Sequence, residues 1–338
     1  MSEVKLKAPF PYPGGKSVVA AEIWDALGNV GHYMEPFYGS GAVHLARPDY
    51  NPGKHVETIC DKDGFVCNVW RAMKFSPLET AEWCDWPVNH ADLAARKKQL
   101  IKNEQHLLEN LVADPEWHDA KLAGYWIWAS SCWIGSGLTR TGSIPRLTGF
   151  RGAGVNTLWQ IPRPQLSNDQ GVVSIAKRPR LTGFSGTGVF AKGCQIEEHF
   201  LRLQARLRRV RVVCGDWTRI CGGEWQDKFS GVCGIFFDPP YATITRDTRI
   251  YHHDSTTVAH DVREWALKRG ESSNYRIVLA GYYDEHVSLL EHGWRVKRWC
   301  TGGGYSNIAK GESQGKKNKV LEALFFSPAC LDNQPELF

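Results

Sequence analysis

Apolar runs separated by turn residues recur in two stretches of the chain, and their lengths predict buried strands with helices between them. The predicted strands are a short run from His32 and the segments 55–60, 210–214, 234–237 and 276–280. Helical spacing predicts helices over 18–27, from near Ala42, and over 65–73 and 258–269. This alternation is typical of an α/β fold with a parallel sheet. Residues 294–299 and 320–326 are expected to close the sheet as an antiparallel pair.

The regular alternation stops between residues 76 and 211. Leucines at helical spacing predict one long helix over 89–111, and a Trp-rich segment over 117–133 predicts a buried helix. A third, amphipathic helix is expected over 195–209. The expected organisation is an α/β domain of residues 1–75 and 212–330, an inserted domain of residues 76–211, and a tail of residues 331–338.

The inserted region is strongly basic. The chain of 338 residues has a formal net charge of +5. Residues 140–211 hold 13 Lys and Arg against three Asp and Glu, a balance of +10, so the rest of the chain sums to −5. A basic segment on an acidic body indicates an anionic polymer as partner, with a solvated basic surface as the alternative. Arg-Leu-Thr-Gly-Phe occurs twice, from Arg146 and from Arg180, and predicts paired loops or a duplicated hairpin.

Composition narrows the class of protein. Apolar residues make up 42% of the chain, which is enough for a buried core. No leader follows Met1 and no apolar run approaches 18 residues, so we expect neither a secretion signal nor a membrane span. The ten cysteines include no Cys-x-x-Cys pair. Reduced thiols are therefore favoured over a zinc site or a disulfide framework.

Two loops near the start of the chain are candidates for ligand contact. In Pro13-Gly14-Gly15-Lys16, after Tyr12, the glycines allow close approach of the backbone to a ligand, and Lys16 can meet an anionic group. The spacing of a Walker loop is absent. The Gly39-Ser40-Gly41 turn after Glu35-Pro36-Phe37 is typical of a nucleotide-binding α/β unit. His44 replaces the third glycine of the dinucleotide fingerprint, which disfavours NAD.

Acidic residues stand at the ends of the predicted strands. Asp61 lies about 20 residues after the glycine turn, where an acid commonly bonds ribose hydroxyls, whereas Asp63 fits a helix cap better. Asp216 and Trp217 follow the strand over 210–214, and Asp238 follows that over 234–237. Because the carboxyl ends of parallel strands share one edge of a sheet, these acids would lie along a site suited to a nucleoside.

The segment Asp238-Pro239-Pro240-Tyr241 has the most specific chemistry. Two successive prolines cannot donate ladder hydrogen bonds, so the strand must end there. A carboxylate and a proline carbonyl both accept hydrogen bonds, and together they can hold an amino group with its lone pair turned towards an electrophile. Tyr241 offers a ring on which a heterocycle can stack, and a base in a duplex would have to be flipped out to reach it. Taken alone, the segment is also compatible with an ordinary strand-to-turn junction.

With these motifs in this order, the chain resembles the Dam-like, alpha-group DNA N6-adenine methyltransferases, which use S-adenosylmethionine. The matching stretches are Pro13-Gly14-Gly15-Lys16, Glu35-Pro36-Phe37-Tyr38-Gly39-Ser40-Gly41, Asp61-Lys62-Asp63, Gly215-Asp216-Trp217, Asp238-Pro239-Pro240-Tyr241, Tyr251-His252 and Lys319-Val320-Leu321-Glu322. The resemblance covers residues 9–75 and 212–327. It implies a Rossmann-like methyltransferase sheet with helices on both faces and a target-recognition domain in the inserted region.

The resemblance also implies roles for single residues. The methyl donor is expected to contact Tyr12, Gly14, Lys16, Glu35, Pro36, Phe37, Gly39, Gly41, Asp61, Asp216, Trp217 and Asp238. Catalysis is assigned to Asp238, Pro239, Pro240 and Tyr241. Contacts with double-stranded DNA are expected from Arg140, Arg146, Arg151, Arg180, Lys316 and Lys317. The family usually has Trp or a similar residue where Tyr12 stands, and the inserted region departs from the family pattern.

The expected product is S-adenosylhomocysteine, the chemistry requires no metal, and the expected location is the cytoplasm of a bacterial or phage-infected cell. The sequence leaves the oligomeric state open, with a monomer favoured. Two alternatives stay open: the same chemistry on cytosine N4 or on RNA, whose enzymes more often carry Ser or Asn in place of Asp238, and a non-catalytic DNA-binding relative. The sequence does not decide the recognition sequence. Restriction-modification, phage protection and housekeeping are equally compatible with it.

Overall fold

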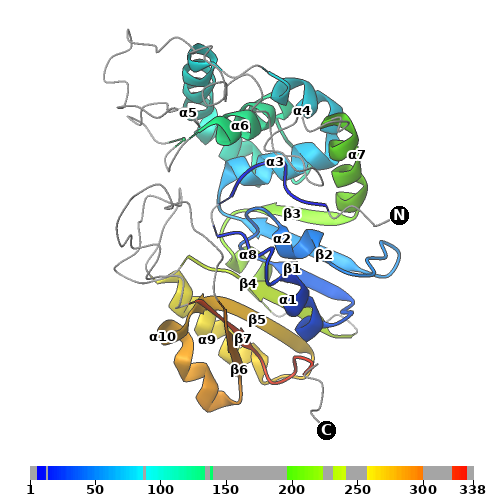
Figure 1. The fold of residues 1–338 in the computed structure, drawn as a ribbon, viewed down its shortest axis with the longest axis vertical. Helices are drawn as coiled ribbons and strands as arrows, with labels where there is room; N and C mark the ends of the chain where they lie inside the picture. Colours follow the sequence, from blue (N-terminus) through cyan, green and yellow to red (C-terminus); the bar gives the residue numbers. More distant parts are fainter. Residues whose placement is uncertain are drawn as a thin grey trace, which may run out of the picture. The chain divides into compact units, whose positions relative to one another are not determined.

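The computed structural model describes residues 6–12, 14–86, 89–133, 138–139, 196–223, 231–240, 257–299 and 322–332 (Figure 1). The chain divides into two compact units, which we describe separately. Unit 1 comprises Met1–Gly15, Gly39–Leu45 and Asp61–Gly215. Unit 2 comprises Lys16–Tyr38, Ala46–Cys60 and Asp216–Phe338.

The described strands form a mixed seven-stranded sheet in the order β3-β2-β1-β4-β5-β7-β6. Their bounds are β1 (His32–Glu35), β2 (Val56–Asp61), β3 (Val210–Cys214), β4 (Cys233–Phe237), β5 (Tyr275–Tyr282), β6 (Arg295–Arg298) and β7 (Glu322–Phe326). Strands β2, β1, β4 and β5 pair in parallel, and β7 runs antiparallel to both β5 and β6. The predicted α/β fold and its closing antiparallel pair are therefore confirmed.

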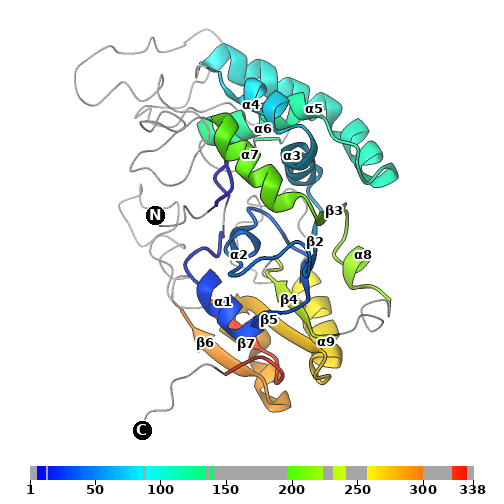
Figure 2. The same cartoon turned by 90° about the vertical axis from the view of Figure 1, so that its right-hand side faces the viewer.

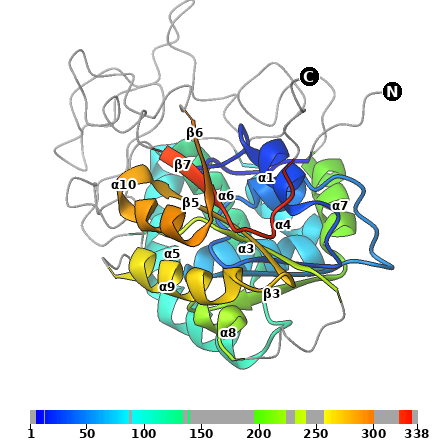
Figure 3. The same cartoon turned by 90° about the horizontal axis from the view of Figure 1, so that it is seen from below.

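Helices cover both faces of the sheet in unit 2. These helices are α1 (Ala20–Leu27), α8 (Thr218–Cys221), α9 (Val258–Gly270), α10 (Tyr283–His286) and the 3₁₀ helix η2 (Val287–His292). Figures 2 and 3 show α1 and α9 on opposite faces of β4 and β5. Gly234 lets the segment after α1 approach β4, since a Cβ there would lie 2.8 Å from the side chain of Val30. Helix α1 begins two residues later than predicted, after Val19, which provides no side-chain cap.

Unit 1 is mainly helical. Its helices are α2 (Ala42–Leu45), α3 (Gly64–Phe75), α4 (Pro77–Cys84), α5 (His90–Ala113), α6 (Ala120–Cys132) and α7 (Ile196–Leu207). The last three confirm the predicted helices, and the side chains of Asn89 and Asp119 cap α5 and α6 at their first turns. Trp126, Trp128 and Trp133 are buried, as the Trp-rich pattern indicated. Among the described residues, no helix is long and apolar enough to cross a membrane.

Candidate active site

Lys16 and Asp238 form an ion pair at the carboxyl end of β4 in unit 2. Strand β4 is apolar and buried throughout, and Asp238 is the first residue after it. Lys16 Nζ lies 2.9 Å from Asp238 Oδ2, and the two side chains are 4% and 21% exposed. Burial raises the pKa of Asp238, while the charge and hydrogen bond of Lys16 oppose that rise. The lysine therefore favours the ionised carboxylate and fixes its direction.

Glu35 is the last residue of β1, which runs parallel to its neighbour β4. Glu35 therefore lies at the same edge of the sheet as Asp238. Its side chain is buried, and Oε2 accepts a hydrogen bond of 2.8 Å from the hydroxyl of Tyr33. Burial, and then the charge of Glu35, raise the pKa of Tyr33, so the phenol stays protonated and donates. After Glu35, Pro36 is buried and the ring of Phe37 packs against that of Phe237.

The Gly39 turn is fixed by three contacts within unit 1. The φ angles of Gly39 and Gly41 are 47° and 60°, in the left-handed region that favours glycine. The N–H of Gly39 donates to Asp61 Oδ2 at 2.8 Å, and its carbonyl accepts from Trp70 Nε1 at 2.9 Å. A Cβ on Gly39 would lie 2.4 Å from the ring of Tyr12. Backbone conformation and close packing therefore both require glycine here.

Asp61 uses both carboxylate oxygens to shape the backbone. Besides the bond from Gly39, its Oδ1 accepts the N–H of Asp63 at 2.9 Å. Burial, with the charge of Asp63, raises the pKa of Asp61 from 3.8 to about 7, although the backbone N–H bonds oppose this shift. Each oxygen retains a second lone pair with which a ligand hydroxyl can bond. Asp63 caps α3 by accepting the N–H of Phe65 at 2.8 Å, which confirms the predicted cap.

Asp216 and Trp217 have structural contacts within unit 2. Oδ1 of Asp216 accepts from the backbone N and the hydroxyl of Thr218, at 3.0 and 2.8 Å, and so shapes the start of α8. Trp217 is buried, and its ring meets those of Phe237 and Trp265 edge to face. The structure thus places Trp217 in the core of unit 2. The donor contacts assigned to both residues stay predictions.

Several predicted site residues lie outside the described part of the chain. These are Tyr241 and all six residues expected to contact DNA: Arg140, Arg146, Arg151, Arg180, Lys316 and Lys317. Gly14 is described, with a φ of 74°. The roles assigned to all of these residues stay predictions.

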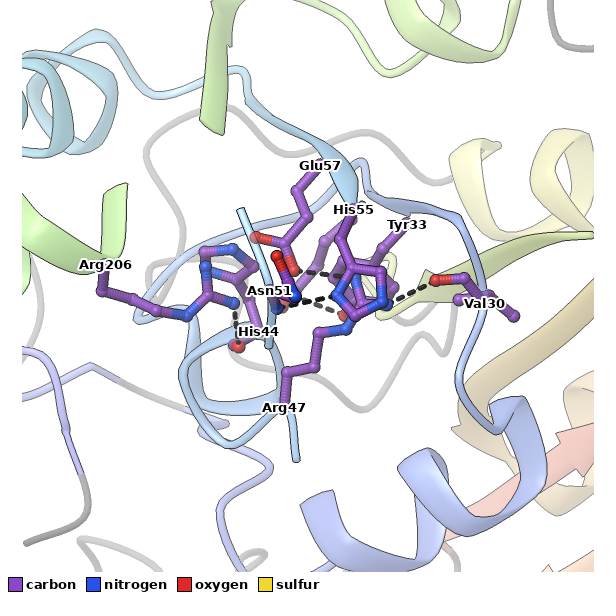
Figure 4. Close-up of polar contacts among 9 residues, drawn as sticks. Val30, Tyr33, His44, Arg47, Asn51, His55, Glu57 and Arg206 are labelled. Carbon is purple, nitrogen blue, oxygen red and sulfur yellow. Dashed lines mark hydrogen bonds and ion pairs between the residues drawn. The ribbon is translucent and has the colours of Figure 1, made fainter. Parts of the chain in front are cut away.

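Sequence reasoning missed a buried ion pair in unit 2, between Arg47 and Glu57 (Figure 4). Arg47 Nη1 lies 3.0 Å from Glu57 Oε1, and both side chains are fully buried. Arg47 also donates to the carbonyl of Val30, and its guanidinium lies 5.0 Å from the ring centre of Trp24. The pair ties the segment before β2 to β2 itself, and the bond from Arg47 to Val30 ties that segment to the residues before β1. The sequence signal was a glutamate inside the predicted strand 55–60.

In the described geometry, unit 2 holds an ion pair after β4 between a buried lysine and a partly exposed aspartate, and unit 1 holds a glycine turn fixed by an acid. Residues 12–116 match the family model described as D12 class N6 adenine-specific DNA methyltransferase. This match confirms the resemblance carried by the motifs, and it supports an N6-adenine DNA methyltransferase in general. Methyltransferases of this D12 class use S-adenosylmethionine. The matched region includes Tyr12, Lys16, Glu35 and Asp61, whereas Asp238 follows it. A search among curated proteins found no match.

Proposed function

We propose that the chain transfers a methyl group from S-adenosylmethionine to N6 of an adenine flipped out of double-stranded DNA. The observation that carries the proposal is the Lys16–Asp238 pair, placed directly after a buried parallel strand in a chain whose first part matches the D12 class. Ligands of open α/β sheets bind at the carboxyl ends of the strands. A carboxylate followed by two prolines at that position suits an amino group as substrate.

The residues described above have the chemistry that the methyl donor requires. The donor carries a cationic amino group, a ribose and an adenine. Glu35 provides a buried negative charge for a cation, and Asp61 keeps spare lone pairs for hydroxyl groups. Because Gly39 has no Cβ, the ring of Tyr12 packs directly against the turn, where it can contact the donor. We propose that these residues, with Tyr12 and Asp216, bind the donor.

The proposed chemistry at the target centres on Asp238. Its carboxylate and the carbonyl of Pro239 accept the two hydrogens of the adenine amino group and turn the nitrogen lone pair towards the methyl group. The new N–C bond forms as the C–S bond breaks, sulfur takes the electron pair, and the nitrogen loses one proton to Asp238 or to water. Tyr241 stacks on the flipped base. Positioning and electrostatics provide the acceleration in this scheme.

The direct test is transfer of radiolabelled methyl from S-adenosylmethionine to unmethylated duplex DNA, followed by nucleoside analysis of the product. We expect N6-methyladenine from the wild-type chain and none from Asp238→Ala, which should still bind the donor at least partly. Asp284→Ala, which changes an exposed acid elsewhere in unit 2, is the matched control and should stay active. N4-methylcytosine, methylated RNA, or full activity of Asp238→Ala would each overturn the proposal. Single-molecule sequencing of DNA from cells expressing the protein would then give the sequence context.

A further inference from the structure

Glu322 is an acid near the Lys16–Asp238 pair to which the proposed reaction assigns no role. It is the first residue of β7 and pairs with Tyr282, the last residue of β5. Strand β5 is also the parallel neighbour of β4, with Phe237 opposite Leu279. The register therefore brings Glu322 to the sheet edge at which Asp238 follows β4. All these residues belong to unit 2.

One carboxylate oxygen of Glu322 is buried without a hydrogen bond. Within the described residues, Oε2 has no hydrogen-bond partner. The backbone of Glu322 is held separately, since its carbonyl accepts the N–H of Trp299 at 3.1 Å. Burial raises the pKa of Glu322, the charge of Lys16 lowers it, and the charge of Asp238 raises it. The carboxylate therefore lies within electrostatic reach of both members of the ion pair, and it is an acceptor not yet in use.

The proposed reaction creates a need for such an acceptor. Lys16 Nζ bonds Asp238 Oδ2, the carboxylate that must accept hydrogens from the target amino group. An ammonium at this position also repels the sulfonium of the donor. A lysine has a flexible stem and three donor hydrogens, so its head can change partners without moving the backbone. A second acid within reach would let it leave Asp238 while staying paired and buried.

We propose that Glu322 is a positioning residue that takes the Lys16 ammonium when Asp238 binds the target amino group. This inference rests on the proposed function, because the exchange is useful only if Asp238 binds a target amino group. The exchange keeps the buried cation paired in both states, frees the acceptor oxygens of Asp238, and moves positive charge away from the reacting centre. Glu322 touches neither donor nor target in this scheme and acts only through Lys16.

The sharing of Lys16 between two acids is tested without any enzymatic activity. Asp238→Asn, Glu322→Gln and their combination are compared by thermal unfolding, in the wild-type chain and in Lys16→Met. We expect each single variant to change Tm by less than about 2 °C, because Lys16 keeps one acid. The combination should lower Tm by more than the sum of the two changes, because Lys16 then has neither acid. In Lys16→Met, the Tm change of the combined variant should equal the sum of the two single changes. Additive shifts in the wild-type background would overturn the proposal.

The catalytic consequence is tested by single-turnover methyl transfer. Glu322→Gln should slow the transfer about tenfold, as for a lost hydrogen bond between charged groups, with donor affinity unchanged. In Lys16→Met the same change should alter the rate by less than about twofold, because Glu322 acts through Lys16. The exposed Glu291→Gln is the control and should behave as wild type. An equal loss in both backgrounds, or no loss at all, would refute the role of Glu322. Absence of methylated adenine from the wild-type chain would instead refute the proposed function, and the unfolding experiment would still decide whether Lys16 is shared.

Discussion

At the scale of single residues, Asp61 combines two backbone hydrogen bonds with a pKa that burial raises to about 7. The folded state thus holds the proton more tightly than the unfolded state, in which the pKa is 3.8. Between about pH 4 and pH 7 the unfolded chain releases this proton and the folded chain keeps it. We expect this group to lower the free energy of unfolding as pH rises through that window, with the full cost present above pH 7.

Asp61→Asn removes the titration, and urea unfolding across pH 4 to 8 measures the effect. The variant should be less stable than wild type at low pH, because an amide cannot accept both N–H bonds. The difference in the free energy of unfolding between Asp61→Asn and the wild type should narrow as pH rises towards 7 and then stay constant. The exposed Asp284→Asn should change neither stability nor its slope with pH. A pH-independent difference for Asp61→Asn would contradict the assignment.

The second prediction at the scale of single residues concerns Gly39. Gly39→Ala forces a side chain into a left-handed conformation, at a cost of about 1–2 kcal/mol, and presses the new Cβ against the ring of Tyr12. We expect weaker binding of S-adenosylmethionine by calorimetry together with this loss of stability. Gly31→Ala is the control, because a Cβ there meets nothing within 4 Å. Unchanged donor affinity in Gly39→Ala would argue against the turn as part of the donor site.

At the scale of elements, α3 begins at an acid that the sequence placed correctly. Asp63 accepts N–H groups from the first turn of the helix, so Asp63→Ala should cost about 1 kcal/mol of stability. Asp63→Asn keeps an acceptor and should cost only about a few tenths of a kcal/mol of stability. Chemical denaturation of the three proteins measures the difference. Equal losses in the two variants would show that charge, and not the cap, stabilises this end of α3.

Elements were predictable wherever the pattern of side chains was local. Helices α5 and α6 begin at cap residues, and β4 is a continuous apolar run, so neighbouring residues suffice to locate them. The start of α1 was predicted too early because Val19 offers no side-chain cap as a signal. Helix α4 was missed, since it is short and follows α3 after a single residue.

The candidate site was predictable as a set of residues but not as a set of partners. Motifs singled out Lys16, Asp61 and Asp238, yet only the fold pairs Lys16 with Asp238 and brings Glu322 within reach of both. The same holds for Arg47 and Glu57, whose side chains meet because the loop between them folds back. Contacts between distant parts of the chain depend on tertiary packing, which no local pattern specifies.

At the scale of the whole molecule, charge is unevenly distributed along the sequence, with +10 over residues 140–211 and −5 over the rest. A protein that neutralises phosphates releases condensed counterions, so its affinity for DNA falls linearly with salt on a logarithmic scale. We therefore expect binding to a duplex to weaken by orders of magnitude between about 50 and 200 mM salt. Fluorescence anisotropy at several salt concentrations measures the slope.

Single substitutions test whether the basic segment is the source of that slope. Arg146→Ala and Arg180→Ala should each weaken binding and reduce the slope by about one, if each arginine contacts one phosphate. Lys54→Ala removes an exposed charge outside the segment and should leave both quantities unchanged. A slope near zero, or an equal response to Lys54→Ala, would place the DNA surface elsewhere. Because the two arginines head the two copies of one repeated sequence, equal effects would indicate that both copies contact the backbone. Unequal effects would indicate that the copies have different roles on the duplex.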